Sequence, residues 1–176
     1  MAKDPTFSSG DFVVYPTHGV GKIIGVEEQT IGGDTLELFI IDFEQDRMKL
    51  RVPVEKSKIS GLRRLSSRDR LKTAMSTLKS APRVKRTMWS RRAQEYEAKI
   101  NSGEIVLIAE VTRDLFRPDD QPEQSYSERQ IFEAASSRLA RELAAMEKTD
   151  EPTALEKILD VLREHAPQYY ENAEDA

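Results

Sequence analysis

The chain has 176 residues, with 27 basic and 31 acidic side chains and a formal net charge of -4 at pH 7. It contains no cysteine, which excludes disulfides, thiolate catalysis and cysteine-ligated zinc. Because no apolar run approaches the ~20 residues of a membrane span and the N-terminus lacks the hydrophobic stretch of a signal peptide, we expect a cytoplasmic protein without a membrane partner.

The first part of the chain, residues 7–65, has the pattern of a small β-barrel. Short segments rich in Val, Ile, Leu and Phe, each bounded by turn residues, are expected to be strands. They are Asp11–Pro16, Val20–Thr30, Thr35–Phe43 and Met48–Val54. Gly32-Gly33-Asp34 supplies the positive-φ positions of one hairpin, and Glu44-Gln45-Asp46 closes a second.

The last of these strands is predicted to lie at a sheet edge. Pro53 cannot donate a hydrogen bond to a ladder, so Lys49–Val54 should present open backbone groups. Such an edge can accept a strand from a partner protein. It can equally be an edge that is guarded by Lys and Arg, and both interpretations remain open at this point.

Helices are predicted after Leu65. Their starts are indicated by Ser66 with Asp69, by Thr87, by Ser125 with Glu128 and by Pro152. The expected helices run from Ser66 to before Pro82, from Thr87 to Gly103, over residues 104–117, from Ser125 to about Lys148 and over Glu151–Glu164. The predicted fold is therefore α+β, with a β-barrel domain at residues 1–65 and an all-α, five-helix domain at residues 66–166.

Residues 167–176 are expected to form an acidic, flexible tail, because they carry too few apolar groups to pack. An autoinhibitory role against the basic residues of the chain and no role at all are both compatible with this composition. Deleting residues 167–176 should raise DNA binding only if the tail is autoinhibitory.

The charge is distributed in three blocks. Residues 1–46 carry 2 basic and 9 acidic side chains, residues 47–92 carry 16 and 2, and residues 93–176 carry 9 and 20, so the net charges are -7, +14 and -11. A block this positive in an acidic chain indicates a surface for a polyanion. The alternative is a solvated basic face without a ligand.

The only tryptophan, Trp89, lies inside this basic block. The run Arg83–Arg92 places five cationic side chains around it. Cations neutralise phosphates and a flat aromatic ring can stack on a base, so the combination predicts nucleic-acid binding. The start of the predicted helix also favours phosphate near Arg86, through its N–H groups and the positive end of its dipole. The alternative is a basic helix start whose indole packs inward.

Several motifs in the same order resemble the CarD/CdnL family of bacterial RNA polymerase-binding regulators. They are Gly10–Gly21, Arg51-Val52-Pro53, Trp89-Ser90-Arg91-Arg92, Ile108–Leu115 and Ser127-Glu128-Arg129. The resemblance covers roughly residues 7–165.

The resemblance implies an N-terminal Tudor-like or SH3-like barrel, shared with the transcription-repair coupling factor, that docks on the RNA polymerase β subunit. It also implies a helical domain that meets promoter DNA at the upstream edge of the transcription bubble. Carried over by position, Trp89 enters the minor groove while Arg91 and Arg92 contact the DNA backbone. Arg51 and Pro53 then lie on the polymerase-contacting strand.

Three further residues complete the candidate sites, and one position departs from the family. Lys85 and Arg86 join the DNA-binding candidates through the charge of their run, and Lys49 joins the polymerase-binding candidates on the predicted edge strand. Gln29 stands where some family members have arginine, which implies a weaker contact with polymerase there or one that depends more on strand pairing. We expect a monomer that stabilises open promoter complexes, largely independently of sequence.

Other function classes are less favoured by the residues. An enzyme is not expected, because His18 and His165 are the only histidines and no carboxylate pair has an activated partner. We accordingly predict no catalytic residue, metal or cofactor. A stand-alone nucleic-acid-binding protein and a protein-only adaptor remain as alternatives. Activation and, through slower promoter escape, repression are both compatible with the favoured mechanism.

Overall fold

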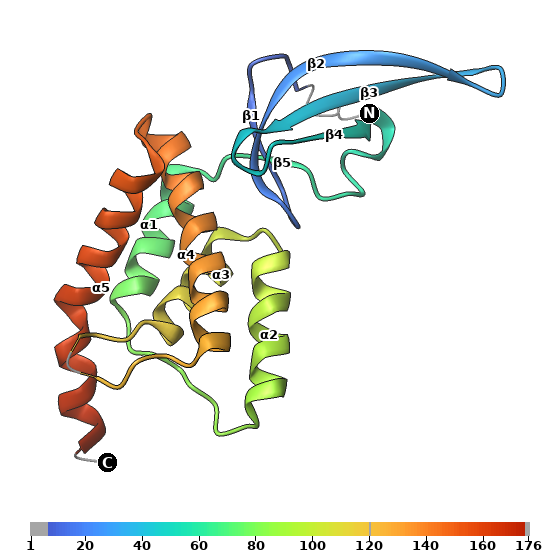
Figure 1. Ribbon diagram of the computed structural model, residues 1–176. Helices are drawn as coiled ribbons and strands as arrows, with labels where there is room; N and C mark the ends of the chain where they lie inside the picture. Colours follow the sequence, from blue (N-terminus) through green and yellow to red (C-terminus); the bar gives the residue numbers. More distant parts are fainter. Residues whose placement is uncertain (1–6, 120, 175–176) are drawn as a thin grey trace. The chain divides into compact units, whose positions relative to one another are not determined.

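The structure is a computed structural model that describes residues 7–119 and 121–174, with only the backbone described for residues 167–174. The chain divides into two compact units, residues 1–65 and residues 66–176. The described strands belong to the first unit and the described α-helices to the second (Figure 1).

The first unit is built around an antiparallel sheet with the strand order β4-β3-β2-β1-β5. Its strands are β1 (Phe12–Tyr15), β2 (Gly19–Ile31), β3 (Asp34–Phe43), β4 (Met48–Pro53) and β5 (Arg63–Arg64), with 3-10 helices at Glu44–Asp46 and Val54–Lys56. Strand β5 was not predicted, because two residues are too short for a hydrophobic pattern. The α+β class is confirmed, whereas the closed barrel is not, since β4 and β5 hold the two ends of the strand order.

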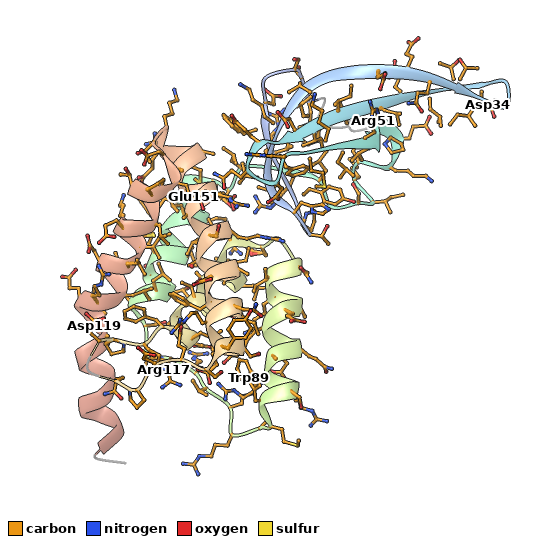
Figure 2. All side chains as sticks on the ribbon, in the orientation of Figure 1. Asp34, Arg51, Trp89, Arg117, Asp119 and Glu151 are labelled. Atoms are coloured by element: carbon orange, nitrogen blue, oxygen red, sulfur yellow. The ribbon has the colours of Figure 1, made fainter. Side chains whose placement is uncertain are left out.

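The long β2–β3 hairpin turns on two glycines. Gly32 and Gly33 have φ angles of 61° and 86°, the left-handed conformation that a two-residue hairpin loop requires at both positions. Asp34 already belongs to β3 and pairs with Ile31, so the turn is one residue shorter than the predicted Gly-Gly-Asp segment. The hairpin end carries Asp34 (Figure 2).

A close approach of strand β2 to the core depends on Gly21. A Cβ atom at this position would lie 2.6 Å from Ile41 Cγ2 and 2.8 Å from Phe43 Cε1, and both side chains are buried. We expect Gly21→Ala to destabilise the first unit by about 1–3 kcal/mol, because the added methyl must displace packed atoms. Urea unfolding measures this cost. Gly25→Ala is the matched control on the same strand, since a Cβ there meets nothing within 4 Å; equal stabilities of the two variants would contradict the prediction.

The described residues of the second unit form five α-helices. They are α1 (Arg68–Lys79), α2 (Trp89–Asn101), α3 (Ile105–Leu115), α4 (Tyr126–Glu147) and α5 (Glu151–Glu174). Helix α3 is buried along most of its length, and Ile105, Ile108, Ala109, Val111 and Leu115 belong to the shared core. Side chains of α4 and α5 pack around it, among them Leu139, Leu143, Ile158 and Leu162.

Two of the predicted helix caps are wrong by one residue. Ser67 rather than Ser66 caps α1, and its side chain accepts a hydrogen bond from the N–H of Arg70. Met88 rather than Thr87 occupies the cap position of α2 and offers no side-chain cap. The cap of α4 is as predicted, since Ser125 Oγ accepts from the N–H of Glu128 at 3.2 Å.

Ser66 is not available as a helix cap because it is bonded to α4. Glu142 is 3% exposed, and its Oε1 accepts both the N–H of Ser66, at 2.8 Å, and the hydroxyl of Ser66, at 2.7 Å. A buried carboxylate needs such donors, because burial without them is costly. The first residue of the second unit is therefore fixed to the C-terminal part of α4.

Helix α5 begins after Asp150, whose Oδ1 accepts the N–H of Thr153 at 2.8 Å. Hydrogen bonds from Thr153, chiefly from its side chain, hold the pKa of Asp150 below its usual value. This cap therefore contributes stability above the ordinary aspartate pKa and loses it as the pH falls through the lowered value. The helix continues to Glu174, beyond the predicted end at Glu164. The side chains of the predicted flexible tail, residues 167–176, lie outside the described part of the chain.

Candidate functional site

Trp89 is the first residue of α2 and is half-buried (Figure 2). Its Nε1–H donates a hydrogen bond to Ser127 Oγ, in the first turn of α4, at 3.1 Å. Its ring lies against the helical core and 6.3 Å from the ring of Tyr96, centroid to centroid. The indole is thus neither fully projecting nor sealed in the core. It is held in one orientation and keeps part of its surface in contact with solvent.

Arg92 lies between Trp89 and Tyr96 rather than in open solvent. Its guanidinium carbon is 5.4 Å from the centre of the Trp89 ring and 5.8 Å from that of Tyr96, within the range of cation-π contacts. Its Nε is buried and has no hydrogen-bond acceptor among the described residues. This predicted DNA-binding residue therefore also fixes the indole.

The other predicted DNA-binding cations are more exposed to solvent than Arg92. Arg86 and Arg91 are exposed, and together with Met88 they line an open depression of about 560 Å³ beside the start of α2. Lys85 is also exposed, with its Nζ 3.4 Å from Glu95 Oε2. An ion pair this exposed contributes only ~0–1 kcal/mol, so Lys85 can exchange its partner for a phosphate at little cost.

A buried ion pair on α3 anchors the loop between α1 and α2, which carries Lys85 and Arg86. Asp114 Oδ1 accepts hydrogen bonds from Arg113 Nε at 2.9 Å and from the backbone N–H of Arg83 at 3.0 Å. Arg113 Nη1 donates to Ser80 Oγ at 2.9 Å. The side chains of Arg113 and Asp114 are 6% and 3% exposed. Both residues belong to the sequence motif Ile108–Leu115, but the sequence alone assigned them no role. The signal that could have found them is a pair of adjacent opposite charges at the end of a mostly apolar helix.

The second candidate site is the outer face of β4, an edge strand as predicted. Lys49, Arg51 and Pro53 alternate along this strand and so share one face. Lys49 and Arg51 are exposed and Pro53 is partly exposed, while Val52 on the opposite face is buried in the sheet's core. Strand β4 thus offers two cations and a proline beside the backbone of a sheet edge.

Arg51 is oriented by a residue of strand β2, which is not adjacent to β4. Its Nε donates to Glu27 Oε2 of β2 at 2.9 Å, across the intervening strand β3, and Figure 2 labels Arg51 on β4. This contact uses only one edge of the guanidinium. Gln29 lies two residues beyond Glu27 on the same strand, so the position that departs from the family pattern faces the same side as Arg51 and Glu27.

Comparisons with known proteins assign both units. The domain described as CarD-like/TRCF RID matches residues 7–66, and the CarD C-terminal domain matches residues 73–160. The chain belongs to the CarD family. It is 30% identical over 137 residues to a Bacillus subtilis (strain 168) protein named "Putative transcription factor YdeB". The aligned region covers 78% of this chain and 90% of that protein.

Membership of the CarD family indicates a transcription-associated factor, and the match to the CarD-like/TRCF RID domain implies interaction with RNA polymerase. Within residues 7–119 and 121–174, no group of three or more His, Asp or Glu side chains is arranged to hold a metal ion. The same residues form no helix that is long and apolar enough to span a membrane.

Proposed function

We propose that this chain regulates transcription by binding the RNA polymerase β subunit through β4 and contacting promoter DNA at the upstream edge of the bubble through the start of α2. It thereby stabilises the open promoter complex, largely independently of sequence. One observation carries the proposal, namely that two features occur in one chain. The unit that matches the CarD-like/TRCF RID domain has a cationic edge strand, β4, and the helical unit has a basic helix start at α2 that includes the oriented indole of Trp89. The chain acts as a non-enzymatic monomer in the cytoplasm, associated with the nucleoid through RNA polymerase.

The proposed polymerase contact uses the open edge of β4. A partner strand can pair with such an edge through main-chain hydrogen bonds, while Lys49 and Arg51 contact acidic side chains next to it. A Tudor-like or SH3-like arrangement of the first unit would present this edge outward. Main-chain pairing would also reduce the dependence of affinity on the residue at position 29.

The energetics explain why the chain would act together with polymerase. Stacking of one aromatic ring on a base contributes ~1–3 kcal/mol, whereas opening a base step costs a few kcal/mol. One indole therefore roughly breaks even on intact duplex. At a bubble edge the step is already open, so the contact favours the open state, and a ligand shifts an equilibrium by its difference in affinity for the two states. A difference of about 1.4 kcal/mol increases the open complex tenfold.

A footprint of RNA polymerase on promoter DNA, with and without the protein and at two salt concentrations, tests the proposal. We expect added protection at the upstream bubble edge, weaker at high salt because the cations contact phosphates. Tight binding of the protein alone to duplex DNA would instead support a stand-alone nucleic-acid-binding protein. Polymerase binding without any change in the footprint would support a protein-only adaptor.

Arg51→Ala is expected to lower the affinity for the β subunit about tenfold, the equivalent of about 1.4 kcal/mol. The variant removes the guanidinium that Glu27 orients on the face of β4. Titration of labelled protein with purified β subunit measures the change. Lys72→Ala is the matched control, since Lys72 is an exposed cation on α1. Equal affinities of the two variants would show that β4 is not the contact.

A further inference from the structure

Among the described residues of the second unit, the most exposed aromatic side chain is Tyr126, the first residue of α4. It is 77% exposed, whereas Trp89 is half-buried. Its hydroxyl accepts a hydrogen bond from Gln130 Nε2 at 2.7 Å, and Gln130 is exposed as well. The ring lies outside the apolar core of the unit. Packing therefore does not explain an aromatic side chain at this position.

Tyr126 lies next to the indole of the candidate DNA site. The residue that follows it, Ser127, accepts the Nε1–H of Trp89 at 3.1 Å. Because successive residues of a helix point about 100° apart around its axis, the tyrosine ring lies beside the contact between Ser127 and the indole rather than over it. Two aromatic side chains from different helices therefore border the same part of the surface, one held in place and half-buried and the other open.

The neighbours of Tyr126 on the exposed face of α4 are polar, and one of them is cationic. Arg129 and Gln130 lie three and four residues further along the helix, so they share the face of Tyr126. Arg129 Nη2 lies 3.7 Å from Oε2 of Glu123, whose side chain is 90% exposed. Because so exposed an ion pair contributes little, the cation can bind a phosphate instead. An open aromatic ring beside a cation and an amide is a combination with which proteins bind single-stranded nucleic acids.

The ligand that fits this ring is an unpaired base. Bases inside a duplex are stacked on both faces, and an exposed ring can stack on one of them only after a base step has been opened, which is unfavourable. At the edge of a transcription bubble the strands are already separated, so a base of a released strand offers a free face. The basic start of α2, next to the tyrosine through the contact between Trp89 and Ser127, attracts the phosphates of the same strand.

We propose that Tyr126 stacks on an unpaired base of the separated promoter strands at the upstream bubble edge, next to the contact proposed for Trp89. This inference rests on the proposed function and adds to it a second aromatic contact, on the single-stranded side of the edge. Closing of the bubble requires the base to leave the tyrosine ring, so the contact slows the collapse of the open complex. Gln130 holds the hydroxyl and thereby limits the rotation of the ring.

Three variants of the full chain, in complex with RNA polymerase and promoter DNA, test this contact. Tyr126→Ala removes the ring, Tyr126→Leu keeps an apolar side chain without an aromatic face, and Tyr126→Phe keeps the ring without the hydroxyl. Each variant is measured on the intact promoter and on promoters in which one base at the upstream bubble edge, in either strand, is replaced by an abasic site. The measurement is the open-complex lifetime after challenge with competitor DNA.

On the intact promoter we expect Tyr126→Ala and Tyr126→Leu to shorten the lifetime about three- to tenfold, because the stacking of one ring on a base is lost. Tyr126→Phe should stay close to the wild type. An abasic site at the contacted base should shorten the wild-type lifetime by the same factor and leave the lifetime with Tyr126→Ala unchanged. Because Tyr126 is exposed, the thermal stability of Tyr126→Ala should equal that of the wild type.

A wild-type lifetime for Tyr126→Ala or for Tyr126→Leu would overturn the inference. So would a loss for Tyr126→Ala that has the same size at every abasic position, since it would indicate that the ring contacts protein or the DNA backbone rather than a base. In either case the proposed function stands if Trp89→Ala still shortens the lifetime. If the wild-type protein itself neither binds polymerase nor extends the lifetime, both are overturned.

Discussion

Asp114→Ala is expected to destabilise the second unit by about 3–5 kcal/mol. The substitution leaves the guanidinium of Arg113 buried without its carboxylate, and an unpaired buried charge costs this much. It also removes the acceptor of the Arg83 N–H. The loss should be visible in urea unfolding followed by far-UV circular dichroism. The loop that carries the cations should in addition become more susceptible to trypsin.

A surface carboxylate provides the control for this prediction. Asp160 pairs with Arg163 on α5 at 3.3 Å, and its side chain is 67% exposed. Asp160→Ala should change the stability by less than about 0.5 kcal/mol, because exposed ion pairs contribute little. The double variant Arg113→Met/Asp114→Ala should be more stable than Asp114→Ala alone, since it removes the unpaired charge as well. A loss below about 1 kcal/mol for Asp114→Ala would show that the pair does not fasten the loop.

Trp89→Ala is expected to have two effects of different origin. In the isolated protein it should cost about 2 kcal/mol of unfolding free energy, because a half-buried indole and its hydrogen bond to Ser127 are lost. In the promoter complex it should shorten the open-complex lifetime about tenfold, through the lost stacking. Denaturant unfolding and competitor-challenged lifetimes separate the two effects.

Ser127→Ala separates orientation from stacking. It removes the acceptor of the indole N–H while the ring remains, so we expect a lifetime between those of the wild type and Trp89→Ala. Polymerase affinity should be unchanged in both variants, because neither residue belongs to the first unit. If Trp89→Ala bound polymerase normally and left the lifetime unchanged, the proposed mechanism would be wrong.

The sequence predicted those parts of the fold that depend on local pattern. Strands β1 to β4 and the five helices follow from alternating or helical spacing of apolar residues, and the Gly32-Gly33 turn follows from the need for positive φ. The errors have tertiary causes. Ser66 resembles a helix cap in the sequence, but Glu142, 76 residues away in the chain, takes both of its donors. Strand β5 exists only because β1 is there to pair with it.

The candidate site was predictable in its residue types and not in its geometry. The charge of the basic run and the presence of an indole are properties of the sequence. Which of the cations remains available is not, since Arg91 is exposed whereas the neighbouring Arg92 stacks on two aromatic rings. The exposed position of Met88 and the anchoring by Asp114 likewise arise from the packing of α2 and α3 against the rest of the unit.

The bond between Ser66 and Glu142 has a mechanical consequence. Any tension transmitted along the backbone from the sheet unit arrives first at Ser66, where two hydrogen bonds pass it to α4. Helix α1 is thereby shielded from being unwound from its N-terminal end. If the proposed contacts with polymerase and DNA pull the two units apart, the load acts on these two hydrogen bonds. They should therefore break before the helices unfold.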